Sequence, residues 1–229
     1  MKNLSLKICL AIAAFASPVW SETVDDLVER NGKYYLKFSD EGFSGKVDGT
    51  VQGTLKDGLW VGKYTEYHEN GQLRSKGDYK YGKKEGLWEI YEDNGQLYEK
   101  GNYTDGKKEG LWEAYYEKGP LWAKYNYKDG KEDGLWEWYF ENGQLWRKGT
   151  IQDEKEEIWE EYNANGQLVF KQGFKDGRKN GLYEWYWDNG YLGSKGTYRD
   201  DKKDGFWEYF NKDGTIKKTE TYKTGVRVE

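Results

Sequence analysis

Residues 134–149 read GLWEWYFENGQLWRKG, and this stretch predicts the fold of most of the chain. Its Asn142-Gly143 pair stands between two runs rich in apolar and aromatic residues. Such a pair is a strong hairpin signal, because a type I′ turn needs positive φ at both central residues. We therefore expect two short antiparallel strands around a two-residue loop, with Phe140 opposite Leu145.

The turn glycine of this stretch belongs to a periodic series. Turn glycines recur at a constant interval of about 24 residues, and a fixed period of this length indicates stacked supersecondary units. Only the step from Gly143 to Gly166 is shorter, by a single residue. The sequence predicts an all-β fold, an elongated array of antiparallel β-hairpins in a single-layer twisted sheet. It has seven units of about 24 residues and a divergent N-terminal cap. The turn glycines are Gly71, Gly95, Gly119, Gly143, Gly166, Gly190 and Gly214.

Charged residues support one hairpin register. With the loop at Asn142-Gly143, Glu137 faces Lys148 and Trp136 faces Gly149. A Glu-Lys pair across a hairpin contributes roughly 0.2–1 kcal/mol. We also expect the Trp ring to cover the glycine opposite it in its own hairpin in two units, as Trp88-Gly101 and Trp136-Gly149. Three other units place Tyr125, Gln172 and Glu220 opposite the Trp. The Glu-Lys pair recurs in five of the seven units, as Glu89-Lys100, Glu113-Lys124, Glu137-Lys148, Glu160-Lys171 and Glu184-Lys195.

Side chains alternate along a strand, so the sheet has two faces. The Trp face carries Trp88, Trp112, Trp136, Trp159 and Trp207 and, in this register, Leu97 and Leu145. The Tyr face carries Tyr91, Tyr115, Tyr139, Tyr162 and Tyr186.

Seven further aromatic residues exceed the shared pattern. We expect Tyr98, Trp122 and Trp146 on the Tyr face, and Trp138, Phe140, Trp185 and Trp187 on the Trp face. Aromatic residues are enriched in binding interfaces, so these seven are candidate partner-binding residues. The alternative interpretation is that they thicken the core.

Two units depart from the consensus. In the fifth, Glu154 replaces a turn glycine and the glycine before Ile158 is missing, which predicts an irregularity in the stack. In the third, Lys118-Gly119-Pro120 replaces Asn-Gly-Gln, which predicts a different turn.

The N-terminus has the pattern of an export signal. Lys2 and Lys7 precede the apolar run CLAIAAFA at residues 9–16, which is too short to span a bilayer. We expect residues 1–21 to be a signal peptide cleaved after Ser21, or alternatively after Ala16, and the protein to be periplasmic or extracellular. Residues 22–58 would form the cap and residues 59–229 the repeats, as one continuous domain.

Composition disfavours several classes of function. The 36 basic and 41 acidic residues are evenly mixed with a net charge of −5, so neither nucleic acid nor an anionic membrane is a favoured ligand. Most carboxylates recur with the period, whereas a catalytic pair should be singular, and no nucleophile–base set is present. The one histidine, His68, is interpreted as a variable strand position. The sequence predicts no catalytic residue, cofactor or metal site.

Several segments resemble a known repeat. DGKKEGLWEAYY at residues 105–116 and ENGQLWRKG at 141–149 are similar to the bacterial variant of the MORN repeat, in the family often labelled YwqK-type antitoxin. YYLKF at 34–38 with FSGKVDG at 43–49 resembles the opening of such proteins. The resemblance spans residues 27–225. It implies a β-hairpin repeat fold, a scaffold for protein or lipid interaction without catalytic residues, and a partner toxin that the repeats neutralise.

Two functional hypotheses follow. The first is a non-enzymatic scaffold that binds a protein partner outside the cytoplasm, in an antitoxin-like role. The second is recognition of a cell-envelope glycan or of choline, through ring stacking or cation–π contact with the aromatic side chains.

Overall fold

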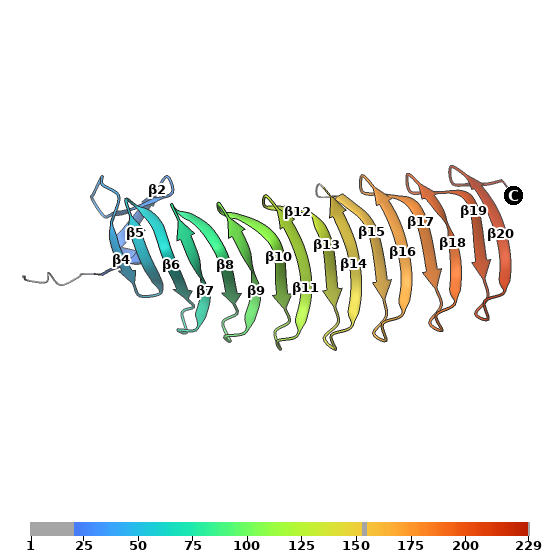
Figure 1. Cartoon of the computed structure of the whole chain (residues 1–229), viewed down its shortest axis with the longest axis horizontal. Helices are drawn as coiled ribbons and strands as arrows, with labels where there is room; N and C mark the ends of the chain where they lie inside the picture. Colours follow the sequence, from blue (N-terminus) through green and yellow to red (C-terminus); the bar gives the residue numbers. More distant parts are fainter. Residues whose placement is uncertain (1–20, 153–154, 229) are drawn as a thin grey trace, which may run out of the picture.

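One sheet runs the whole length of the molecule (Figure 1). The structure is a computed structural model that describes residues 21–152 and 155–228. Within these residues the sheet has 19 strands, and from β4 to β21 they follow one another in chain order. Each pairs antiparallel with the next, except that the short β12 and the following β13 both pair with β11. Strand β1 joins it by a parallel pairing with β4. The expected all-β hairpin array is confirmed.

The strands are bounded as follows: β1 (Glu22–Thr23), β2 (Leu27–Arg30), β3 (Lys33–Leu36), β4 (Gly45–Asp48), β5 (Val51–Lys56), β6 (Leu59–Tyr67), β7 (Leu73–Lys80), β8 (Lys83–Tyr91), β9 (Leu97–Thr104), β10 (Lys107–Tyr115), β11 (Leu121–Lys128), β12 (Lys131–Glu132), β13 (Gly134–Tyr139), β14 (Leu145–Gln152), β15 (Lys155–Tyr162), β16 (Leu168–Lys175), β17 (Arg178–Tyr186), β18 (Leu192–Arg199), β19 (Lys202–Phe210), β20 (Ile216–Lys223) and β21 (Val226–Arg227). A 3₁₀ helix, η1 (Val24–Asp26), follows β1.

The repeat turns are longer than expected. The Phe140 N–H donates to Gln144 O and the Gly143 N–H donates to Phe140 O, both at 2.8 Å. Of Asn142 and Gly143 only the glycine has positive φ, at 83°. Tyr139, not Phe140, pairs with Leu145. The expected two-residue type I′ loop is therefore wrong here. Residues 140–144 form a longer loop that ends with its glycine in the left-handed region.

The asparagine of the repeat turn is required for its side-chain hydrogen bonds and not for a positive φ. Asn142 Oδ1 accepts the Gln144 N–H at 3.0 Å, and its amide donates to Ala164 O in the next unit at 3.3 Å. The equivalent amides of Asn70 and Asn189 also reach a carbonyl 23 residues further on. Asparagine here ties one hairpin to the next.

Two-residue turns with the type I′ backbone lie at the opposite end of the hairpins. Asp105 and Gly106 both have positive φ, 51° and 82°, between the paired residues Thr104 and Lys107. Aspartate and glycine tolerate this region best, which explains why Asp-Gly recurs between units.

The wrong prediction for the loop length does not affect the pairing at the strand centres. The register shifts by one residue between Trp138 and Tyr139, and this bulge absorbs the longer loop. Trp136 therefore still pairs with Gly149 and Glu137 with Lys148, as predicted. Past the bulge, Leu97 pairs with Tyr91 and Leu145 with Tyr139, so the placement of these leucines on the Trp face is wrong.

A second bulge separates each hairpin from the one before it. Glu109 pairs with Asn102 and Trp112 with Gly101, so two residues of β10 are left over. Gly110 stands in this bulge with φ 69°, in the left-handed region that glycine adopts without strain.

The two departing units behave differently. In the fifth unit, Glu154 lies outside the described residues. Next to it, Thr150 on β14 pairs with Ile158 on β15 and Ile151 pairs with Glu156. Only Glu157 is therefore left without a partner in this bulge. The bulge is one residue shorter because the glycine is missing.

In the third unit the Tyr116 N–H still donates to Pro120 O, as the Phe140 N–H donates to Gln144 O, so the expected different turn is wrong. The backbone of this turn needs no N–H at Pro120.

The Trp row forms the core of the array. Trp88, Trp112 and Trp207 are at most 1% exposed, although the repeats form a single layer. A Cβ atom on Gly101 would lie 2.2 Å from the Trp112 ring. The ring of Trp112 therefore covers the glycine of the preceding unit, where we had expected Trp88 of the same hairpin. Its Nε1 donates to Asn102 O at 3.1 Å.

The N-terminal cap has its own small core. Leu27, Val47, Leu55 and Trp60 are buried together beneath the β2–β3 hairpin and the first strands of the long sheet. The predicted boundary at residue 58 falls in the turn between β5 and β6, where the sheet continues without a break. The predicted signal peptide lies almost entirely outside the described residues.

Candidate functional site

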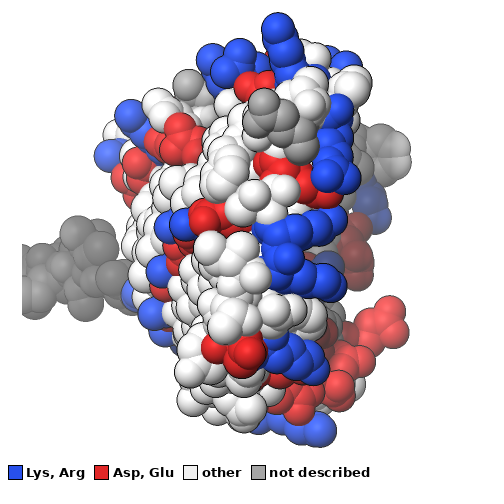
Figure 2. All heavy atoms as spheres, turned by 90° about the vertical axis from the view of Figure 1, so that its right-hand side faces the viewer, with Lys and Arg blue, Asp and Glu red and all other residues white. Residues whose placement is uncertain are grey.

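The described residues hold no group of three or more His, Cys, Asp or Glu side chains placed to bind a metal ion. In residues 21–152 and 155–228 no helix has the length and apolar character to cross a bilayer. Viewed along the array from its C-terminal end, basic and acidic side chains lie interspersed (Figure 2). What recurs along the sheet are rows of side chains on its two faces.

One continuous row of charges crosses the Tyr face. Lys100 on β9 pairs with Glu89 on β8 and also with Glu113 on β10. The same alternation holds on every long strand from β7 to β19. We call this row the charge ladder. It consists of Lys76, Glu89, Lys100, Glu113, Lys124, Glu137, Lys148, Glu160, Lys171, Glu184, Lys195 and Glu208.

Ion pairs and tyrosine hydroxyls join the ladder. Glu160 contacts Lys148 at 3.0 Å and Lys171 at 2.8 Å, so one carboxylate bridges two strands. The hydroxyl of Tyr162 donates to Glu160 at 2.6 Å. Partial burial raises the pKa of Glu160, but the hydrogen bonds from Lys171, Tyr162 and Lys148 outweigh it and lower the pKa from 4.5 to about 2. Hydrogen bonding and burial act in the same opposing ways at Glu89 and Glu113, whose pKa values are also lowered.

Acid should weaken this protein through the ladder. A depressed carboxyl pKa means that the unfolded chain binds more protons than the folded chain below pH 4.5. The contribution of the ladder to stability is complete above that pH and is lost as the pH falls toward about 2. We expect the melting temperature, followed by circular dichroism, to drop over this interval. Glu160→Gln should have a smaller drop than the wild-type chain, and equal drops in both would contradict the assignment.

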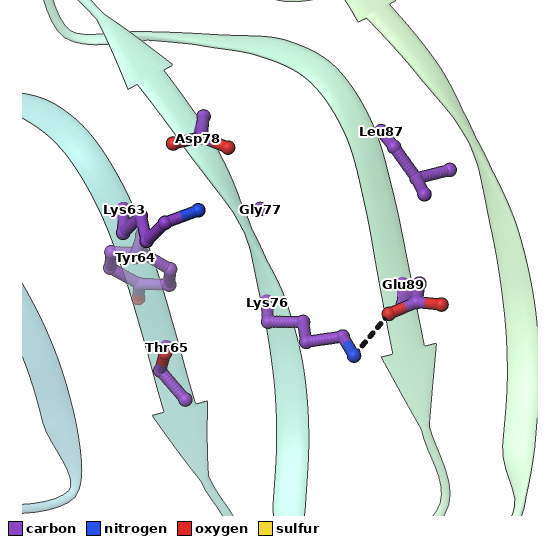
Figure 3. Close-up of a pocket in the computed structure, with 8 residues that line it drawn as sticks. All are labelled: Lys63, Tyr64, Thr65, Lys76, Gly77, Asp78, Leu87 and Glu89. Atoms are coloured by element: carbon purple, nitrogen blue, oxygen red, sulfur yellow. Dashed lines mark ion pairs between the residues drawn. The ribbon is translucent and has the colours of Figure 1, made fainter.

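An apolar row runs beside the ladder. Each member lies two residues before a ladder glutamate, and all six are between 43% and 57% exposed. The apolar row consists of Leu87, Leu111, Leu135, Ile158, Leu182 and Phe206. Figure 3 shows one section, a shallow depression where Leu87 lies on the same strand as Glu89, which forms an ion pair with Lys76 at 2.5 Å. The Tyr face thus combines self-neutralised charges with exposed aliphatic surface.

The seven candidate aromatic residues do not share one environment. Tyr98 and Trp146 are 43% and 40% exposed. Trp122 and Trp138 are partly buried against the core cluster around Trp112 and Trp159. Phe140, Trp185 and Trp187 are also partly buried, and the last two rings lie 4.5 Å apart.

The face assigned to one group requires correction. Tyr98, Trp122 and Trp146 occupy the bulge next to the repeat turn. At the equivalent Gly193, an added Cβ would lie 2.3 Å from the ring of Trp185. Trp122 packs against the core cluster of the Trp face, so its expected place on the Tyr face is wrong. The bulge turns this position toward the Trp face, which an uninterrupted alternation does not predict.

Two features of the sheet were not predicted from the sequence: half of the charge ladder and the role of His68. Only the half of the ladder that lies within hairpins was predicted; the half between hairpins was missed. The available signal was a second recurring offset: a glutamate follows each lysine of the row in the next unit, as Glu113 follows Lys100, with one step shortened by a residue, from Lys148 to Glu160. His68 was interpreted as a variable strand position, but it begins a turn, and its Nε2 donates to Tyr91 O in the next unit at 3.0 Å.

Comparison with known families agrees with this architecture. The MORN repeat variant family matches the chain five times, at residues 60–81, 84–105, 108–129, 132–153 and 158–176. No curated protein matches the chain. The matched segments correspond to successive hairpins, each one strand pair of the sheet with its turn. MORN repeats are generally scaffolds for protein or membrane interaction. Residues 60–176 of this chain form an array of MORN repeat variants.

Proposed function

We propose that this protein is a non-enzymatic scaffold that binds a protein partner outside the cytoplasm. The observation that supports it best is the pair Tyr98 and Trp146, which are 43% and 40% exposed at equivalent positions two units apart. Other units place Arg74, Val169, Gly193 or Lys217 at this position, so the fold does not require an aromatic ring there. Exposed aromatic side chains that packing does not demand are typical of binding hot spots.

Aromatic neighbours pack beside Trp146 and beside Trp122. Trp146 lies 6.1 Å from Phe140, and Trp122, between the two exposed rings, lies 6.5 Å from Tyr116. The hydroxyl of Tyr116 donates to Tyr139 O at 2.7 Å and so fixes its ring to the next hairpin. We call Tyr98, Tyr116, Trp122, Phe140 and Trp146 the aromatic patch. A patch fixed before binding loses little side-chain entropy when a partner covers it.

The export pattern of residues 1–21 supports action outside the cytoplasm. A partner neutralised by occlusion, in the antitoxin-like sense, fits a long scaffold that covers its partner without altering it. Three Trp rings of the core already make cation–π contacts within the chain. The Nζ atoms of Lys84, Lys108 and Lys203 lie 3.9–4.2 Å from the ring centroids of Trp88, Trp112 and Trp207. A choline ligand would have to displace these ammonium groups, which favours a protein partner.

The test replaces the two exposed rings. We expect Tyr98→Ser with Trp146→Ser to lower partner recovery at least about tenfold in affinity capture from the periplasm or medium, read by mass spectrometry. The urea midpoint should stay near that of the wild-type chain, because both rings are already half exposed. The matched control is Tyr191→Ser with Ile216→Ser, at 54% and 60% exposure, which should leave recovery unchanged.

Two results would overturn the proposal. One is equal capture by the patch variant and the control variant. The other is a saturable change in tryptophan fluorescence on titration with choline or envelope glycans that disappears in the patch variant, which would make the ligand a small molecule or carbohydrate.

A further inference from the structure

We propose that the Tyr face docks a second copy of this chain, face to face, about a two-fold axis that runs parallel to the strands between β13 and β14. This inference is independent of the proposed function, because the aromatic patch includes Trp122 on the Trp face. It explains two features that the single chain leaves without a purpose: the exposed apolar row, and the even number of residues in the charge ladder.

The apolar row is too extensive to be incidental. Its six side chains stand at equivalent positions of six consecutive units, each at least 43% exposed. Scattered exposed leucines need no explanation, but six exposed apolar side chains at one regular spacing along one face mark an interaction site. Twelve strands span eleven intervals of about 4.8 Å, and over a strip four residues wide at about 3.3 Å per residue this gives about 700 Å². A standard interface buries about 800 Å² on each partner, so the strip has the size that a stable dimer needs.

The ladder is complementary to itself. It starts with Lys76 on β7, ends with Glu208 on β19 and alternates without interruption between them. A two-fold axis through its centre reverses the row. Because the row has an even number of alternating charges, reversal places every lysine opposite a glutamate of the second copy. Lys148 then faces Glu137, and Lys76 faces Glu208. An isologous interface requires this property of self-matching.

The same rotation fits the apolar row. The strands that carry apolar-row residues alternate with strands that carry Asp, Asn, Thr or Gly: Leu111 pairs with Asn126, Leu135 with Thr150 and Ile158 with Gly173. At the first of these strands, β7, the residue is Asp78, beside Leu87. Since reversal exchanges the two kinds of strand, each leucine faces a small or polar residue of the second copy, between two of its apolar side chains. The rows therefore interdigitate, as facing sheets do in a sandwich.

A second copy fits this strip better than a helix. The apolar residues recur every two strands, about 9.6 Å, whereas one face of a helix repeats every seven residues, about 10.5 Å. A helix would move out of step by about 1 Å per unit, while a second copy has the same period throughout. Figure 1 shows that the strands keep nearly one tilt from β6 to β20, so the strip stays straight enough to be covered along its length. Sliding the copy by one unit preserves the charge match but shortens the overlap, which favours the central axis.

The decisive experiment uses two charge reversals, alone and mixed. In Lys148→Glu, residue 148 would face Glu137 of the second copy, and in Glu137→Lys, residue 137 would face Lys148. Each variant alone then repeats a like-charge contact twice across the axis. In a heterodimer of the two variants every contact is again between opposite charges. Effects within each chain are the same alone and mixed, so a gain on mixing reports the contact between chains.

We expect the protein, as the expressing cell processes it, to sediment as a dimer at micromolar concentration. Each single variant should dissociate at least about tenfold more readily, and the equimolar mixture should return to the wild-type dissociation constant. Lys217→Glu, outside both rows, should leave the dimer intact. Leu135→Ser with Ile158→Ser should give monomers with the circular dichroism spectrum of the wild-type chain.

Other outcomes would overturn the proposal. A wild-type chain that stays monomeric at about 100 µM, above the dissociation constants of most specific dimers, excludes the docking. A dimer whose variants gain nothing on mixing excludes this axis. A dimer lost in Tyr98→Ser with Trp146→Ser, and kept in the apolar-row variant, places the interface at the aromatic patch instead.

Discussion

Trp112→Ala should lower the free energy of unfolding by about 3–5 kcal/mol, as removal of a large buried aromatic side chain usually does. The ring is fully buried, lies 5.1 Å from Tyr103, and its Nε1 donates to Asn102 O at 3.1 Å. Loss of the ring also uncovers Gly101 of the preceding hairpin, so the variant weakens the contact between two units. Urea unfolding followed by circular dichroism measures the change. A loss below about 1 kcal/mol would contradict the role assigned to the Trp row.

The contact between Trp112 and Gly101 can be isolated with a second substitution. Gly101→Ala should cost about 1–3 kcal/mol in the wild-type chain, because the added methyl would lie 2.2 Å from the ring. In Trp112→Ala the same substitution should cost little, so the two changes are not additive. Gly110→Ala is the control: nothing lies within 4 Å of an added Cβ there, and only the positive φ opposes it. Equal costs for Gly101→Ala in both backgrounds would show that the ring does not cover this glycine.

Glu99→Ala should lower the free energy of unfolding by about 2–4 kcal/mol, because it removes one partner of a largely buried ion pair. Its carboxylate accepts hydrogen bonds from Lys108 at 2.8 Å and from the Tyr125 hydroxyl at 2.9 Å. The side chains of Lys108 and Glu99 are only 25% and 12% exposed, and the ammonium lies 3.9 Å from the Trp112 ring centroid. The variant leaves this ammonium without compensation, which costs about 3–5 kcal/mol when burial is complete and less here.

The loss should be recovered when both charges are removed. Glu99→Leu with Lys108→Met replaces the ion pair by apolar side chains of similar size, and we expect most of the wild-type stability to return. Urea midpoints of the two single variants and the double variant give the coupling between the residues. If the double variant is as unstable as Glu99→Ala, the unpaired ammonium is not the cause of the loss.

Pairings within a hairpin were predictable because they are local. Glu137 and Lys148 lie equally far from the midpoint between Asn142 and Gly143, so an antiparallel hairpin centred on that midpoint brings them opposite each other. The prediction survived a wrong turn type because the longer loop and the bulge next to it cancel before the strand centre. The leucines next to the turn lie on the other side of that bulge, so they were assigned to the wrong face.

The candidate site was predictable in part. The surplus of aromatic residues drew attention to Tyr98, Trp122 and Trp146, but sequence does not show which of three rings at one repeat position is covered. Trp122 packs against the core cluster, while the exposure of Tyr98 and Trp146 depends on the neighbouring hairpins. The charge ladder is visible only when adjacent hairpins are in register.

The order of residues along the chain is enough to define the period of the array, the hairpins, the side-chain pairs at their centres and the row of buried tryptophans. These features depend on turn chemistry and on contacts between residues fewer than about 24 positions apart. How each hairpin lies against the next is a property of the folded array: which glycine a Trp ring covers, where Tyr98 and its equivalents point, and that the charges form one unbroken row. Bulges set these relations, and a bulge moves side chains without changing the periodic pattern from which the fold was predicted.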